Sequence, residues 1–207
     1  MMPRSLSPVE RDALREVANI GAGHAATALS QMTGGRIMIS VPEISLLQLE
    51  QLAQVVGPLD TPVAAVLMRV MGDFTGTTVL VFRQESAHAL CSLLLRRPAS
   101  PSEAGFDPME QSTVKETGNI LCSAYLNALS DFLGMMLLPS VPELLVDSAV
   151  RALTPDHLRA GSSDNPVFCV ETAFWIEGSE HAHTAQFLLL PDPAALDVIF
   201  DAIHIAS

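Results

Sequence analysis

Gly21, Gly23 and Ala26 fit the G-x-G-x-x-A pattern of a dinucleotide-binding turn. Such a turn holds a pyrophosphate group on the free backbone N–H groups at the start of a helix. The chemistry requires a strand before the first glycine and a helix that opens after it. The elements around these residues therefore decide whether the pattern means nucleotide binding.

A second set of polar residues occurs twice, one hundred positions apart. The two rows are Asp12, Glu16, Asn19 and Ser112, Glu116, Asn119. Residues at i, i+4 and i+7 share one face of a helix, so each row would display a carboxylate or hydroxyl, then a carboxylate, then a carboxamide. Asparagine is a mediocre residue inside a helix. Its recurrence beside glutamate, among neighbours that differ, suggests a duplicated task.

Both rows lie behind the same helix-start signal. Residues 7–10 (SPVE) and 107–110 (DPME) each combine an N-cap residue, a proline at the first helical position and a glutamate that completes a capping box. Apolar or small residues then recur at helical spacing: Leu14, Val17, Gly21, Ala25, Leu29 and Met32 in the first copy, and Val114, Thr117, Leu121, Tyr125, Leu129 and Phe132 in the second. We expect two helices of about 26 residues, each roughly 40 Å long.

This arrangement argues against nucleotide binding. Gly21 falls in the middle of the first expected helix, and no strand precedes it. The second copy has Leu121 and Ser123 in place of the two glycines. We therefore reject the dinucleotide-binding interpretation.

The similarity between the two halves extends beyond the helices. Residues 39–43 (ISVPE) and 139–143 (PSVPE) each predict a short strand closed by proline. Hairpins are expected at 62–82, with Gly72 and Gly76 in the turn, and at 166–190, around Gly178. Amphipathic helices near 85–95 and 193–203 follow them. The repeats span about 7–97 and 107–205, joined by a Pro- and Ser-rich linker at 98–106.

These elements predict the class α+β. We expect one domain over residues 1–207, in which the two repeats form a pseudo-two-fold body with an antiparallel-rich sheet and helices layered on it. The small residues Gly21, Ala22, Ala25 and Ala28 would let another element approach the first helix closely.

Composition limits the classes of partner. The chain has 11 Lys and Arg against 23 Asp and Glu, a formal charge of −12, which repels nucleic acid and anionic lipid surfaces. The first twelve residues contain no apolar signal segment, and no apolar run approaches the roughly 18 residues that span a bilayer. We expect a cytoplasmic protein that binds neither nucleic acid nor membrane.

The cysteines and histidines offer little evidence for a metal site. Cys91, Cys122 and Cys169 are widely spaced among apolar neighbours and are expected to be reduced core residues. His181 and His183 could clip a metal together with Glu180, but this segment fits the exposed turn of a hairpin better. No metal or cofactor is expected on this chain.

At the two polar rows the sequence resembles the CheC family of chemotaxis phosphatases, part of the CheC, CheX and FliY superfamily. The family pattern is Asp or Ser, three residues, Glu, two residues, Asn, twenty-two residues, Pro. It occurs twice without a gap, as Asp12-Glu16-Asn19-Pro42 and Ser112-Glu116-Asn119-Pro142. One departure is His24, where the family leads us to expect asparagine.

The resemblance implies an enzyme that removes phosphate from an aspartate of the response regulator CheY, with one centre in each repeat. Asn19 and Asn119 would position the hydrolytic water, and Glu16 and Glu116 would hold the regulator's lysine. The regulator would bring its own Mg²⁺. Pro42 and Pro142 would have a structural role. Asp12 and Ser112 fit equally well as outer contacts or as ordinary surface residues.

Two other functions are compatible with the resemblance. The same faces could belong to a non-catalytic adaptor that binds CheY or the deamidase CheD and controls receptor methylation. A flagellar-switch component of the FliY type is disfavoured, because nothing in the sequence resembles an added switch-binding domain. The resemblance is strongest over residues 10–43 and 110–148.

Overall fold

The computed structural model describes residues 6–40, 43–48, 51–58, 60–98, 105–154, 167–176 and 183–206. Its two longest helices, α1 (Pro8–Thr33) and α4 (Pro108–Leu133), each contain 26 residues, as predicted. The other elements, in chain order, are β1 (Ile37–Ile39), β2 (Glu43–Leu47), α2 (Leu52–Val56), β3 (Pro62–Gly72), β4 (Gly76–Arg83), α3 (Gln84–Leu95), β5 (Leu137–Pro139), β6 (Glu143–Ser148), α5 (Ala149–Ala152), β7 (Val167–Ile176), β8 (His183–Pro191) and α7 (Ala195–Ala206).

The capping signals fix where the long helices begin and end. The Ser7 hydroxyl accepts a hydrogen bond from the backbone N–H of Glu10, and the Glu10 carboxylate accepts one from the N–H of Ser7. Asp107 and Glu110 make the same reciprocal pair at the start of α4. Glycines in the left-handed conformation, Gly34 and Gly134, end both helices.

The strands form one antiparallel sheet in the order β1-β7-β8-β4-β3-β5, with β2 also paired to β7 and β6 also paired to β3. Each repeat therefore gives its first two strands to the other. β1 and β2 pair with β7 of the second repeat, and β5 and β6 pair with β3 of the first. The α+β class and the antiparallel sheet are confirmed, while the assignment of the whole chain to a single domain stays a prediction.

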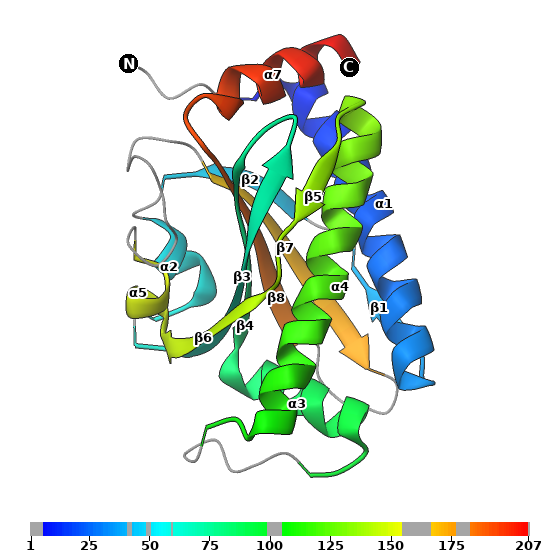
Figure 1. Ribbon diagram of the computed structural model, residues 1–207, viewed down its shortest axis with the longest axis vertical. Coiled ribbons are helices and arrows are strands. Elements are labelled where there is room, and N and C mark those ends of the chain that lie inside the picture. The colour runs from blue at the N-terminus through cyan, green and yellow to red at the C-terminus, as the bar shows by residue number, and fades with distance from the viewer. Residues whose placement is uncertain are drawn as a thin grey trace.

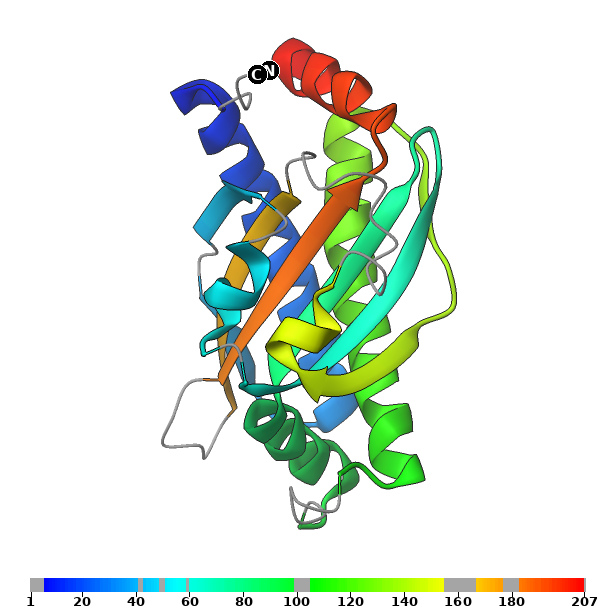
Figure 2. The same cartoon turned by 90° about the vertical axis from the view of Figure 1, so that its left-hand side faces the viewer.

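The two faces of the sheet are covered differently. Figure 1 shows α1 and α4 side by side on one face, with α2 and α5 on the other, and Figure 2 shows the sheet in front of the two long helices. The buried stripes of α1 and α4 meet one set of strand side chains, which includes Ala64, Val66 and Phe187. The smaller cluster on the opposite face includes Val63, Val81 and Leu52.

The short strand expected at 139–143 is wrong in detail, as is its counterpart at 39–43. β5 ends at Pro139 and β6 begins at Glu143, so residues 140–142 lie between two strands. Pro139 pairs with Val70 and Glu143 with Leu67, which places three residues opposite two. This is a bulge, and Pro142, which lacks an N–H, interrupts the ladder there. β1 and β2 show the same register shift against β7.

The three cysteines are unreactive because they are buried. Cys91, Cys122 and Cys169 are free and buried, and their removal from water raises the thiol pKa to about 12, about 12 and about 11 respectively. Such thiols are poor nucleophiles at neutral pH. The structure thus supports their assignment as core residues.

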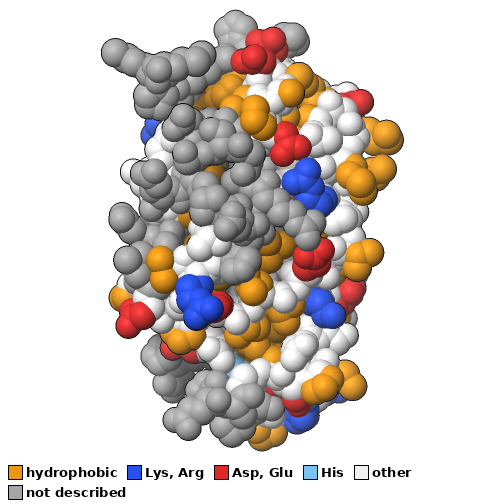
Figure 3. Space-filling model, turned by 60° about the vertical axis from the view of Figure 1, so that its left-hand side comes forward, with side chains coloured by type: hydrophobic (Ala, Val, Ile, Leu, Met, Phe, Trp, Pro, Cys, Tyr) orange, Lys and Arg blue, Asp and Glu red, His pale blue; other side chains and the backbone are white. Residues whose placement is uncertain are grey.

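No described helix is both long and apolar enough to cross a membrane. On the face seen in Figure 3, the described basic side chains are scattered among acidic ones and do not gather in a patch. Gly178 and most of the linker, residues 99–104, lie outside the described residues.

Candidate active site on the two long helices

The first polar row lies on the outer face of α1. Asp12, Glu16 and Asn19 are all exposed, whereas the buried stripe of Leu14, Ala18 and the small residues that follow faces the sheet and α4. Positions 12, 16 and 19 lie within about 60° of one another around the helix axis at 3.6 residues per turn. The carboxylate of Glu16 and the carboxamide of Asn19 therefore project to the same side, one turn apart.

The second row occupies the same place on α4. Ser112 and Glu116 are exposed and Asn119 is half-buried, while Val114, Thr117 and Gly118 on the opposite side are buried. The sequence prediction thus holds for the outward direction of both rows. The difference in exposure between Asn19 and Asn119 was not predicted.

The Glu and Asn side chains of both rows have no partner within the described residues. The side chains of Glu16, Asn19, Glu116 and Asn119 make no hydrogen bond or ion pair to any residue in the described part of the chain. Asp12 differs, because Arg15 lies 3.4 Å from its carboxylate. Since these two side chains are 71% and 60% exposed, the pair contributes little to stability.

The packing of the helices separates the two rows. α1 and α4 run antiparallel in Figure 1, and a Cβ atom at Gly21 would lie 2.7 Å from Cδ1 and 3.1 Å from Cα of Tyr125. Gly21 is thus required by a close helix crossing, which explains the glycine without a nucleotide. Because each row lies on the N-terminal side of the crossing, the two glutamates are separated by roughly 20 Å along the helix axes at 1.5 Å per residue.

The segment that carries Pro142 is anchored to the sheet beside α4. The Ser140 backbone N–H donates to the carbonyl of Arg69, and the Ser140 hydroxyl accepts from the Arg69 N–H. Ser40 makes the same pair of bonds with Ala173 in the other repeat. Pro142 is half-buried in this anchored link, and its structural role stays a prediction. Pro42 lies outside the described residues.

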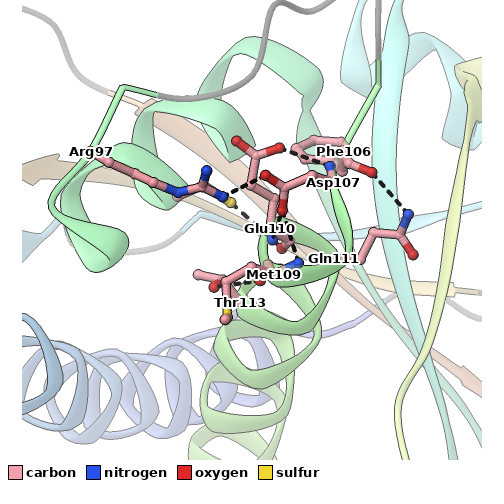
Figure 4. Close-up of polar contacts among 8 residues, drawn as sticks. Arg97, Phe106, Asp107, Met109, Glu110, Gln111 and Thr113 are labelled. Atoms are coloured by element: carbon pink, nitrogen blue, oxygen red, sulfur yellow. Dashed lines mark hydrogen bonds and ion pairs between the residues drawn. The ribbon is translucent and has the colours of Figure 1, made fainter.

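A polar cluster fixes where α4 begins, and therefore where its polar row lies along the helix axis. Arg97, two residues beyond the end of α3, forms an ion pair with Asp107 at 2.5 Å. Figure 4 shows this pair and Glu110 folding back to the same N-cap. The Glu110 N–H and Arg97 hold the pKa of the Asp107 carboxyl below its usual range. Sequence reasoning found the N-cap but missed Arg97, because no local pattern links this residue to an N-cap ten positions later.

The histidines that the structure describes do not form a metal site. No group of three or more His, Cys, Asp and Glu side chains there is placed to hold a metal ion. His24 is exposed on α1, and His183 stacks on Phe174 with 5.4 Å between ring centroids. Glu180 and His181 lie outside the described residues.

Comparison with known proteins agrees with this duplicated arrangement. The model of the CheC-like family matches residues 9–46 and 109–146, which are the two segments that begin with α1 and α4. The chain is 32% identical over 195 residues to the CheY-P phosphatase CheC of Bacillus subtilis, covering 94% of this chain and 93% of that protein. It is 25% identical to the flagellar motor switch phosphatase FliY of the same organism, over 60% of this chain and 32% of that one.

The fold itself has solved counterparts. The crystal structure of Thermotoga maritima FliY superposes with a TM-score of 0.77 at 21% identity, covering 99% of this chain and 100% of that one. Two helices with the same polar row, the repeated match and the near full-length similarity to a CheC protein lead to one conclusion. The chain belongs to the CheC-like family.

Proposed function

We propose that this protein is a phosphatase that removes the phosphoryl group from an aspartate of a CheY-type response regulator. The observation that carries the proposal is the pair of outward-facing Glu and Asn side chains, unpartnered within the described residues, at the same position of both long helices. The similarity to a CheY-P phosphatase over nearly the whole chain supports the substrate.

Each carboxamide acts on water. Asn19 and Asn119 can each accept from and donate to one water molecule, and so hold it in line with the phosphorus of the bound acyl phosphate. Fixing a nucleophile in this way converts a bimolecular step into an effectively unimolecular one. The attacking water forms the new P–O bond, the regulator's aspartate leaves with the electrons of the broken bond, and the water's proton passes to solvent or phosphate.

Each glutamate acts on the partner protein. Glu16 and Glu116 lie one turn before the asparagines, so their carboxylates can pair with a lysine of the regulator and fix the register of docking. A Mg²⁺ ion that the regulator holds at its own phosphorylation site would neutralise the charge of the phosphoryl oxygens. This assignment gives the chain two centres and no metal site of its own.

The test is the lifetime of the phosphorylated regulator in the presence of the wild-type protein, of Asn19→Ala, of Asn119→Ala and of the double variant. We expect each single variant to keep one working centre, and the double variant to leave only the regulator's spontaneous hydrolysis. Neither asparagine belongs to the buried core, and neither side chain has a partner within the described residues, so circular dichroism should show an unchanged fold. A double variant with wild-type activity would refute the proposal. A wild-type protein that binds the regulator without shortening its lifetime would favour the adaptor function.

A further inference from the structure

Apolar side chains flank both polar rows on the same side. On α1, Val9 is 59% exposed and Ile20 is 45% exposed. Their separation of eleven residues is close to three helical turns, so the two side chains lie on one line, next to Asp12, Glu16 and Asn19. On α4 the same two positions hold Met109 and Ile120.

The packing of the described residues does not account for this exposure on α1. Val9 and Ile20 are absent from the core, and the buried stripe of α1 lies on the other side of the helix. On α4, Met109 is 60% exposed, while Ile120 is partly buried and packs against the main core. Core packing explains Ile120, but it does not explain the exposed apolar residues Val9 and Met109 at equivalent positions, or Ile20 on α1. These residues point to a partner on this face.

We propose that Val9 and Ile20 form the apolar part of the docking surface for the phosphorylated receiver domain, with Met109 in the equivalent place on α4. The inference rests on the proposed function, because the occupant is identified by its continuity with the polar row. A receiver domain that presents its phosphoryl group to Asn19 must also cover the neighbouring helix surface. Removing these apolar side chains from water would supply binding energy that is the same in the ground state and in the transition state.

The test uses the Asn119→Ala background, in which only the α1 centre turns over. We expect Val9→Gln together with Ile20→Gln to raise KM for the phosphorylated regulator about tenfold and to leave kcat unchanged, because uniform binding is lost. Glutamine keeps a high helix propensity, which protects the fold. The rise should persist at high ionic strength, since apolar contacts are not screened by salt.

Met32→Gln is the matched control, because Met32 is a 40% exposed apolar residue at the far end of the same helix. It should leave KM and kcat unchanged. Met109→Gln in the Asn19→Ala background extends the test to α4, where we expect a smaller rise in KM.

Two results would overturn the inference: an unchanged KM in the Val9 and Ile20 double variant, or a loss of kcat without a change in KM. These results are distinct from a failure of the proposed function. In that case the Asn19 and Asn119 double variant would remain active, and no KM comparison at a single centre would be possible.

Discussion

α1 and α4 carry the same polar pattern, but they sit in the fold at different depths. The two helices pack on each other, and both contact α3 and α7. α1 otherwise meets the edge strands β1 and β2, whereas α4 lies over β3, β4, β5 and β6. Asn19 and Ile20 are accordingly exposed, while Asn119 and Ile120 are half-buried. A duplicated motif therefore does not produce two identical surfaces, because the neighbours of each copy decide how far its side chains reach into solvent.

The tight contact between Gly118 of α4 and Val66 of β3 should give the largest effect on stability. A Cβ atom at Gly118 would lie 2.6–2.7 Å from three carbon atoms of the Val66 side chain, and Val66 is fully buried. We expect Gly118→Ala to lower the free energy of unfolding by about 2–3 kcal/mol, because helix and strand must separate to make room. Urea unfolding at neutral pH measures the difference.

Ala18, the equivalent residue of α1, is the control for that comparison. Ala18→Gly should cost only about 1 kcal/mol, chiefly through lower helix propensity. If Gly118→Ala proved neutral while Ala18→Gly cost more, α4 would not be the more tightly seated helix.

Two glycines of α1 should respond in opposite directions. A Cβ atom at Gly23 would meet nothing within 4 Å, so Gly23→Ala should stabilise the protein by roughly 0.5–1 kcal/mol through reduced backbone entropy in the unfolded chain. Gly21→Ala should destabilise it, because the new methyl group would press on Tyr125. Thermal unfolding of the two variants side by side reports both signs, and a loss of stability in Gly23→Ala would show that α1 is less open there than the structure indicates.

The two N-caps should differ in how the stability of the protein responds to acid. Of the stability effects expected, this one is the smallest. Asp107 has a lowered pKa in the folded state, so its contribution to stability is complete above the ordinary aspartate value near 4 and is lost as the pH falls through the lower folded value. Ser7, the N-cap of α1, does not titrate in this range. We expect Asp107→Asn to flatten the dependence of the unfolding midpoint on pH below about 4, and Ser7→Ala to shift the midpoint equally at every pH. An equal flattening in both variants would contradict this assignment.

Local signals predicted much of the fold. The bounds of α1 and α4 followed from capping boxes, prolines and terminal glycines, which act within a few residues of one another. The hairpin strands β3 and β4 followed from apolar runs around Gly72 and Gly76 in the same way. The bulge at 140–142 was missed, because it depends on how β5 and β6 register against β3, about seventy residues earlier.

The candidate site also has some features that local sequence determines and others that depend on tertiary contacts. Sequence by itself determined that a carboxylate and a carboxamide share one helix face in each repeat, because helical periodicity fixes direction around an axis. Tertiary structure alone decided that β1 and β2 pair with β7, while β5 and β6 pair with β3. It also decided that Tyr125 packs closely against Gly21, and that Asn119 is less exposed than Asn19. The exposure of a side chain depends on its contacts with segments that are distant in the sequence. The sequence next to the site does not indicate which residues make those contacts.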